Sequence, residues 1–158
     1  MRVTALNQDL TDDVLKLMDL GAPYIRARTS SDYWLYARLF ASTCPVALMD
    51  GVVVGALIAM RSQEDPREIY IQDVMTHPDH RRKGVAATLV DVVRRQGREW
   101  GCRRIYLTSE PDNAAAYAAW TSMGFANTPG DYTANGVAVT RNFKGPSKDR
   151  AVFELLLP

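Results

Sequence analysis

Three consecutive cations, Arg81, Arg82 and Lys83, stand directly before Gly84 and a run of small and apolar residues that is typical of a helix start. The N-terminus of a helix carries unpaired backbone N–H groups and the positive end of the helix dipole, so cations there are unfavourable unless an anion lies among them. A phosphate group resolves that conflict, and Gly84 lets the backbone approach it closely. The pattern therefore predicts a phosphate site, although a solvated charge cluster after a turn explains these residues equally well when they are taken alone.

A second element with functional spacing is the segment NAAAYAAWTSMGF, in which Asn113 is a typical helix cap and Gly124 ends the helix. Together with the spacing Arg-x-x-Gly-x-Ala of Arg81–Ala86 and the strand-like segment before it, this helix resembles the GNAT superfamily of N-acyltransferases. The first motif resembles the acetyl-CoA pyrophosphate loop of that family. The second resembles its Asn-x-x-Ala helix, which ends in Gly-Phe. The resemblance covers roughly residues 45–127.

The resemblance implies that acetyl-CoA is the acyl donor. The backbone of residues 74–76 would pair with the pantetheine arm, and the amides of residues 82–86 would hold the pyrophosphate. Asn113 would contact the cosubstrate near its thiol end, and Thr88 would add a hydroxyl to the phosphate site. The residues assigned to acetyl-CoA are Val74, Met75, Thr76, Arg81, Arg82, Lys83, Gly84, Val85, Ala86, Thr88, Asn113 and Tyr117.

Acyl transfer from a thioester to an amine requires a neutral amine, a polarised carbonyl and a proton for the leaving thiolate. By the pattern of the family, a backbone N–H near Val74 or Met75 would contact the carbonyl oxygen. Along the strand IYIQDVMT, alternation places Tyr70 and Gln72 on one face and Asp73 on the other. Asp73 is the carboxylate nearest to the carbonyl end, so a base or a water relay from Asp73 or Tyr70 is expected. A structural polar residue in the sheet is the competing interpretation of Asp73.

The acid that protonates the thiolate is less clear from the sequence. The family usually places a tyrosine seven residues after the asparagine, where this chain has Trp120, whose indole has no titrating hydroxyl. Tyr117, one turn earlier, is the expected acid, with Ser109 as a weaker candidate; alternatively, Tyr117 is an ordinary core aromatic. Neither Cys44 nor Cys102 is placed to act as a nucleophile, so direct attack in a ternary complex is expected.

A strand, a helix and a second strand must position these residues. The pattern predicts strands over 68–76 and 103–109 and an amphipathic helix over 84–100, which together form a right-handed βαβ unit with parallel strands. Ligands collect at the carboxyl ends of such strands. The predicted fold is α/β (α+β): one domain over residues 1–158, with a mixed, mostly antiparallel twisted sheet, a central parallel strand pair and flanking helices. The other predicted elements are helices near 11–20, 31–40 and 114–123 and strands over 45–49, 52–61, 125–127, 136–143 and 151–157.

The composition is 47% hydrophobic and 23% charged, with a net charge of +1, so neither a nucleic-acid partner nor a membrane partner is expected. The apolar stretch Cys44–Met60 is interrupted by Asp50-Gly51, which predicts a β-hairpin rather than a membrane span. Residues 1–13 lack the apolar core of a signal peptide, so a cytoplasmic location is expected. Two cysteines are too few for a disulfide framework, and His77 and His80 are interpreted as turn residues, so no metal is expected.

The acceptor is suggested by a looser resemblance. The stretch from Tyr33 to Pro66, with the glycine loop and PDNAAA, resembles the diaminobutyrate acetyltransferases of ectoine synthesis. That family also has an aromatic without a hydroxyl at the position of Trp120. The resemblance favours a primary amine of a small molecule, either an amino acid or a diamine, and is compatible with a homodimer. Two other classes stay open: an acetyltransferase acting on protein N-termini or lysines, and a non-catalytic acyl-CoA binding module.

Overall fold

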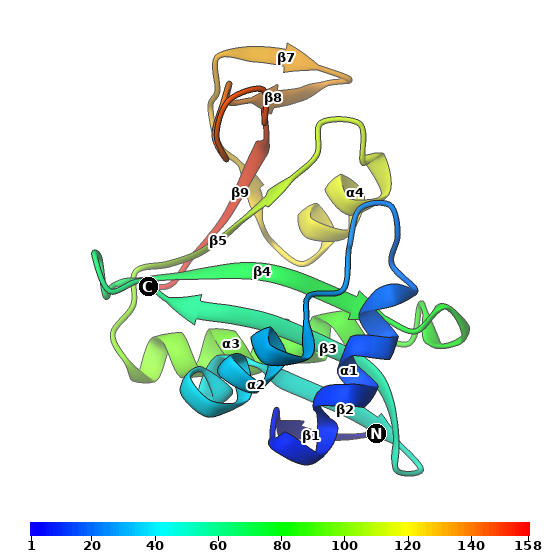
Figure 1. Cartoon of the computed structure of the whole chain (residues 1–158). Helices are drawn as coiled ribbons and strands as arrows, with labels where there is room; N and C mark the ends of the chain where they lie inside the picture. The colour runs from blue at the N-terminus through cyan, green and yellow to red at the C-terminus, as the bar shows by residue number, and fades with distance from the viewer.

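The molecule is built around a twisted seven-stranded sheet in the order β1-β2-β3-β4-β5-β9-β6 (Figure 1). The computed structural model describes residues 1–158. Only β4 and β5 are parallel to each other, and every other pair is antiparallel. The strands of this sheet are β1 (Arg2–Ala5), β2 (Pro45–Met49), β3 (Val52–Arg61), β4 (Glu68–Thr76), β5 (Arg104–Ser109), β6 (Ala126–Asn127) and β9 (Ala151–Leu156). The predicted fold class, with its central parallel pair, is confirmed.

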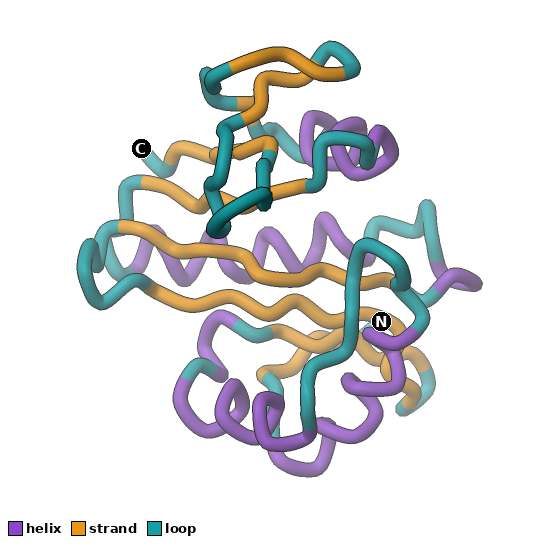
Figure 2. Tube along the Cα trace, turned by 45° about the horizontal axis from the view of Figure 1, so that its top comes forward, coloured by secondary structure: helices purple, strands orange, loops and turns teal.

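Helices cover both faces of the sheet (Figures 1 and 2), so the sheet separates two hydrophobic cores. Helices α1 (Thr11–Asp19) and α2 (Ser30–Leu39) pack on one face, and α3 (Val85–Glu99) packs on the opposite face. One buried cluster joins the sheet to α3, and the other joins it to α1 and α2. Strand β3 lies between the two clusters, so its middle residues are buried on both sides, as its continuous apolar sequence indicates.

Helix α3 approaches the sheet closely because β3 carries a glycine at the crossing point. A Cβ at Gly55 would lie 2.5 Å from Cγ1 of Val85, the first residue of α3. That distance is too short for any side chain, so Gly55 determines how near the start of α3 lies to the sheet. The start of α3 is the segment to which the sequence assigns the phosphate site.

A second, two-stranded sheet projects from the end of the main sheet. It consists of β7 (Tyr132–Ala134) and β8 (Val137–Val139), joined by a tight turn in which Asn135 and Gly136 both have positive φ. The predicted strand over 136–143 is wrong beyond Val139, because the chain bends away into a loop after the Thr140–Arg150 bridge. The sequence pattern also missed β1 and β7.

The remaining helix of the fold, α4 (Ala114–Ser122), follows β5 and lies near β6. None of the helices combines the length and the apolar character that crossing a membrane requires.

Candidate active site

The parallel strands β4 and β5 are joined at one end and separated at the other. Their pairing runs from Glu68 opposite Arg104 to Ile71 opposite Leu107. Beyond Ile71, β4 continues to Thr76 with β3 as its only strand partner. This part of β4, which includes the residues predicted to bind pantetheine, therefore has an open edge on the β5 side. A ligand with amide groups can pair with such an edge as another strand would.

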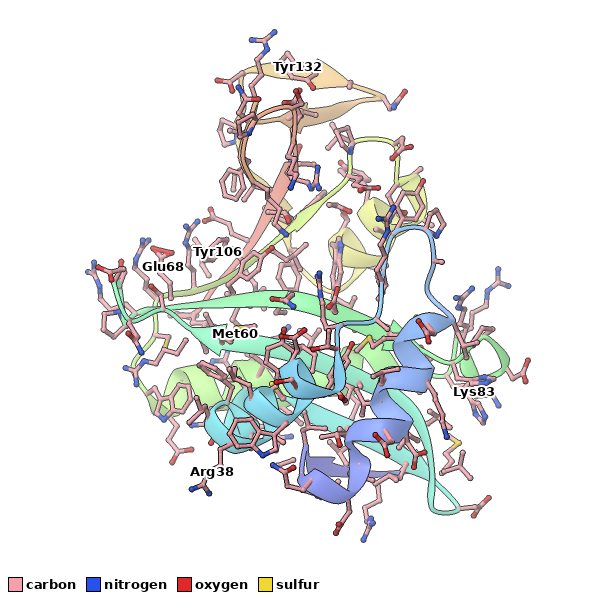
Figure 3. The ribbon with its side chains drawn as sticks, in the orientation of Figure 1. Arg38, Met60, Glu68, Lys83, Tyr106 and Tyr132 are labelled. Carbon is pink, nitrogen blue, oxygen red and sulfur yellow. The ribbon has the colours of Figure 1, made fainter.

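Ion pairs close the opposite end of this strand pair. Glu68 accepts hydrogen bonds from Arg103 and Arg104, and Arg104 also pairs with Glu154 of β9 at 3.0 Å. Figure 3 shows Glu68 at the far end of the sheet from Lys83, which lies in the predicted phosphate loop. The charged network thus holds β4, β5 and β9 together at their joined end and leaves the other end available for a ligand.

A β-bulge redirects the side chain of Asp73. Ile58 of β3 lies opposite Asp73, whereas the next residue, Ala59, lies opposite Ile71, so Gln72 is an extra residue on β4. Simple alternation predicts Gln72 and Asp73 on opposite faces, and this prediction is wrong. Both side chains instead lie on the face of the sheet that α1 and α2 cover, because a bulge shifts the alternation by one residue.

Asp73 is a buried carboxylate with one unsatisfied oxygen. Its side chain is 7% exposed, and its Oδ2 atom accepts no hydrogen bond. A guanidinium nitrogen of Arg28, from the α1–α2 loop, lies 3.7 Å from that oxygen. Burial raises the pKa of Asp73 from its ordinary value of 3.8 to about 6, against the opposing attraction of Arg28 and Lys144. A carboxylate with this pKa can accept a proton from an ammonium group near neutral pH.

Aromatic and polar side chains surround this carboxylate. Tyr36 of α2 accepts a hydrogen bond from Gln72 at 3.0 Å, and burial raises the pKa of Tyr36. Tyr70 shares a hydrogen bond of 3.1 Å with the hydroxyl of Thr108 on β5, so its hydroxyl is directed to β5 rather than to Asp73. The ring of Tyr70 lies 5.1 Å from that of Tyr106. The predicted candidates Asp73 and Tyr70 thus belong to one polar wall but do not bond to each other.

The predicted phosphate loop has a backbone shaped to bind an anion. None of the N–H groups of residues 81–87 donates to an acceptor in the protein, since the first helical bond runs from Thr88 to Gly84. Arg82 and Gly84 both have positive φ, at 63° and 76°, which turns successive amides in a similar direction. The side chains of Arg81, Arg82 and Lys83 are exposed around them. These free donors and cations fit a pyrophosphate group.

Two other residues of the predicted phosphate loop have structural contacts of their own. The hydroxyl of Thr88 donates to the carbonyl of Gly84 at 2.8 Å, so its single proton stabilises the turn in this structure. The side chain of Val85 is buried in the core beside α3, which leaves only its backbone N–H available to a ligand.

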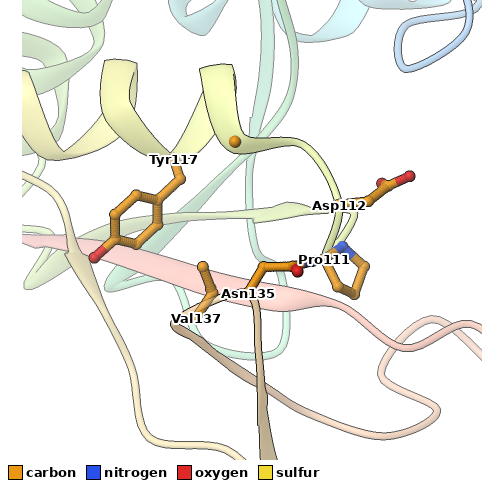
Figure 4. A pocket seen from close by; sticks show the side chains of 6 residues that line it. Pro111, Asp112, Tyr117, Asn135 and Val137 are labelled. Carbon is orange, nitrogen blue, oxygen red and sulfur yellow. The ribbon is translucent and has the colours of Figure 1, made fainter.

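The residues predicted on α4 are directed toward a different part of the molecule. The side chain of Asn113 caps the helix by accepting from the N–H of Ala116 at 3.2 Å. Tyr117 packs edge-on against Phe153 of β9, with ring centroids 5.5 Å apart. It also lines a small pocket between α4 and the β7–β8 hairpin (Figure 4). The structure therefore does not bring Tyr117 into contact with Asp73, and its role as the acid stays a prediction.

Covalent chemistry at cysteine has little support in the structure. Cys44 and Cys102 are both buried, and burial raises the pKa of each thiol, that of Cys44 to about 12. Each thiol lies against a backbone carbonyl. A thiol held protonated and buried is a poor nucleophile. No cluster of three or more histidine, cysteine, aspartate or glutamate side chains is arranged to hold a metal ion.

Sequence reasoning missed Arg28, and it left two interpretations of the loop 144–150 open: contacts to a substrate carboxylate, or simple exposure. Arg28 belongs to no motif and lies far from Asp73 in the sequence, so no local signal indicates that the two side chains meet. The loop containing Lys144 is unusual in the sequence, and the structure shows that the Nζ atom of Lys144 lies 5.8 Å from the ring centroid of Tyr70. Only the tertiary fold brings these two loops to the same carboxylate.

Comparison with known proteins agrees with this geometry. Residues 12–125 match the model of the acetyltransferase (GNAT) family. The chain is 32% identical over 131 residues to an L-2,4-diaminobutyric acid acetyltransferase of Streptomyces coelicolor, covering 77% of each chain. It is 26% identical over 89 residues to an aminoglycoside N(6')-acetyltransferase of Salmonella typhimurium, covering 52% of this chain and 61% of that protein.

The fold also matches a solved structure over nearly its whole length. A diaminobutyrate acetyltransferase from Paenibacillus lautus, in complex with L-2,4-diaminobutyric acid and coenzyme A, superposes with a TM-score of 0.75 at 23% identity. The match covers 99% of this chain and 94% of that one. Taken with the split strand pair and the free amides at the start of α3, these similarities show that the chain belongs to the GNAT family of acetyltransferases, with acetyl-CoA as its cosubstrate.

Proposed function

We propose that this enzyme transfers the acetyl group of acetyl-CoA to a primary amine of a small amino acid or diamine by direct attack in a ternary complex. The observation that carries the proposal is the unsatisfied, buried Oδ2 atom of Asp73, beside the open edge of β4. An acceptor ammonium group is the partner that such an oxygen lacks. The similarity to diaminobutyrate acetyltransferases supports an acceptor of this size.

Each residue of the site has a part in the proposed reaction. The free amides of residues 81–87 and the neighbouring cations hold the pyrophosphate, and the open edge of β4 orients the pantetheine arm. Asp73 takes a proton from the acceptor ammonium, directly or through water, so that a neutral amine attacks the thioester carbonyl. A backbone N–H of Val74 or Met75 receives the developing negative charge on the carbonyl oxygen. The tetrahedral intermediate then collapses: its C–S bond breaks, its nitrogen loses the second proton to solvent, and the leaving thiolate accepts a proton from Tyr117, which solvent reprotonates, or directly from solvent.

Release of free thiol from acetyl-CoA tests this proposal directly. The panel contains amino acids, diamines, aminoglycosides and peptides, each with the wild-type protein and with Asp73→Asn. We expect release with the small amino acids or diamines and a loss of at least 10²-fold in kcat for Asp73→Asn, the usual scale of general base catalysis. Preferential release with peptides would support the protein-acetylating alternative. Binding of acetyl-CoA without release in any mixture would leave a non-catalytic binding module.

A further inference from the structure

Arg28 presents a guanidinium group with few protein partners. Its side chain is 40% exposed, and its only ion pair is the contact of 3.7 Å with Asp73, which is too long for a hydrogen bond. Asp32 lies near Arg28, but its Oδ2 atom already accepts the backbone N–H and the hydroxyl of Thr29. By contrast, Arg104 forms hydrogen-bonded pairs of 3.0 Å with two carboxylates. The donors of Arg28 therefore have no acceptor that satisfies them within the protein.

Lys144 is a second cation near the same carboxylate. It is exposed, forms no ion pair with a carboxylate and lies over Tyr70, close enough to lower the pKa of Asp73. Its loop is fixed by internal bonds: Asp149 accepts the N–H of Asn142 at 2.9 Å, and Asn142 accepts the N–H of Ser147 at 2.9 Å. Hydrogen bonds within the loop thus hold the backbone from which the Lys144 side chain extends.

Arg28 and Lys144 thus both lie near the buried carboxylate of Asp73, and neither cation has a hydrogen bond to an anionic group of the protein. We infer that Arg28 and Lys144 bind a carboxylate of the acceptor while Asp73 receives its amine, so that the enzyme selects a small amino acid over the corresponding plain amine. The inference rests on the proposed function and specifies its substrate class. The amine of the acceptor then contacts Asp73, and its carboxylate contacts the two cations. These contacts satisfy the Oδ2 atom of Asp73 and the free donors of Arg28.

The same charges disfavour a polycationic acceptor. An aminoglycoside carries several ammonium groups, and Arg28 and Lys144 would repel those that do not reach Asp73. Like charges placed together at a binding site weaken binding and exclude the wrong partner. Of the two substrate classes named for the relatives, the site thus favours the one that carries a carboxylate.

Matched pairs of acceptors that differ only in the carboxylate test the inference. The pairs are L-2,4-diaminobutyrate with 1,3-diaminopropane, L-ornithine with putrescine, and L-lysine with cadaverine. We expect the wild-type enzyme to prefer the amino acid of its best pair by at least tenfold in kcat/KM. Arg28→Met and Lys144→Met should each lower kcat/KM for that amino acid about tenfold more than they lower it for the matching diamine, and the excess loss should appear chiefly in KM.

Arg26→Met and Lys148→Met are the matched controls, because they remove a cation from the same two loops. Neither side chain forms an ion pair or a hydrogen bond, so both variants should behave as the wild type does. An unchanged stabilisation by acetyl-CoA shows that each variant is folded.

The possible results distinguish a failure of the carboxylate inference from a failure of the proposed acetyl transfer. Equal use of amino acid and diamine by the wild type, or preferential use of an aminoglycoside, overturns the carboxylate inference and leaves acetyl transfer intact. Equal loss on both members of a pair in Arg28→Met and Lys144→Met shows that these residues act only on Asp73, which also overturns the inference. Absence of thiol release with every amine overturns the proposed function itself.

Discussion

The ionised carboxylate of Asp73 is costly for folding but is the form that the proposed reaction needs. Removing a carboxylate from water favours its protonated form, and here burial outweighs the attraction of Arg28 and Lys144 and raises the pKa to about 6. The tyrosines Tyr33 and Tyr36 of α2 lie on the same side and supply no positive charge to offset that burial. At neutral pH the folded protein therefore carries a destabilising ionised carboxylate at the position proposed for the base.

This conflict predicts that Asp73→Asn stabilises the protein in a pH-dependent way. Because the folded pKa of about 6 lies above the ordinary 3.8, the folded state binds more protons than the unfolded state between these values. The contribution of Asp73 to stability is thus present below pH 4 and is lost as the pH rises through 6. At pH 8 the variant should gain up to about 3 kcal/mol in the free energy of unfolding, and almost nothing at pH 4. Urea unfolding at both pH values measures the difference; equal effects at both would contradict the assignment.

The activity of the wild type should follow the same ionisation. With Asp73 as the base, kcat/KM for the acceptor rises with pH through about 6, and Asp73→Asn removes this acidic limb while leaving a low, flatter rate. The dependence of kcat/KM for the acceptor on pH, measured at saturating acetyl-CoA for both proteins, tests this prediction. An acidic limb that persists unchanged in the variant would assign the ionisation to another group.

Tyr117 gives a second prediction at the scale of one residue. If its hydroxyl protonates the leaving thiolate, Tyr117→Phe lowers kcat by about 10²-fold or more and leaves acetyl-CoA binding intact. The phenyl ring keeps the edge-on contact with Phe153, so stability should change little. Trp120→Phe, which alters the contact with Phe125, is the control and should act mainly on KM or stability. A Tyr117→Phe enzyme within a few-fold of the wild type would assign the proton to solvent or Ser109.

Among the elements, the start of α3 is the segment whose backbone is proposed to bind the donor. Gly84 holds φ at 76°, and a Cβ added there would meet no protein atom. A β-branched residue at this position therefore strains the left-handed backbone without meeting protein atoms, in addition to placing side-chain bulk where a phosphate would approach the amides. The strain changes the direction of the amides that are free between residues 81 and 87.

We predict that Gly84→Val abolishes most of the stabilisation by acetyl-CoA. A ligand present at a hundred times its Kd stabilises the folded state by about 2.7 kcal/mol, which is roughly 5–10 °C in Tm for a chain of this size. Gly101→Val is a close control, since Gly101 follows the other end of α3 with φ of 73° and equally open surroundings. Both variants should lose similar intrinsic stability, but only Gly84→Val should lose the shift. An equal shift in the two would remove the phosphate site from this loop.

The elements were the most predictable part of the fold, and their local irregularities were the least predictable. The strands 45–49, 52–61 and 68–76 agree with their predicted limits, because apolar runs bounded by turn residues determine them locally. The bulge at Gln72 depends on how β3 and β4 pair, and the sequence of β4 alone does not reveal it. The loop proposed to bind the donor is one continuous segment that the sequence alone can indicate, whereas Arg28, Asp73 and Lys144 come near each other only in the folded chain.

For the molecule as a whole, the two cores on either side of the sheet contain one cysteine each. Cys44 belongs to the cluster with α1 and α2, and Cys102 belongs to the cluster with α3. The thiols lie 3.4 Å from the carbonyls of Ala59 and Pro66 respectively. A serine hydroxyl can donate to the same two carbonyls, so replacement at both sites keeps each core polar atom satisfied.

Direct transfer predicts that the double variant Cys44→Ser with Cys102→Ser keeps its kcat within a few-fold of the wild type, with at most a modest loss in stability. Steady-state thiol release and a thermal melt measure the two quantities. Mass spectrometry of the wild type mixed with acetyl-CoA alone is the complementary measurement. An acetyl-cysteine adduct that turns over to product on addition of amine would replace direct transfer with a two-step reaction.

The bridge between Thr140 and Arg150 closes the loop that is proposed to contact the acceptor. The loop that carries Lys144 begins and ends at this bridge, and it lies outside the segment matched by the family model. Its length and sequence can therefore vary while β8 and β9 stay in place, because each doubling of a flexible loop costs only about 0.6 kcal/mol in closure entropy. If Lys144 contacts the acceptor as proposed, exchange of this loop by selection or by an engineer should change the acceptor and leave the proposed donor site unaltered.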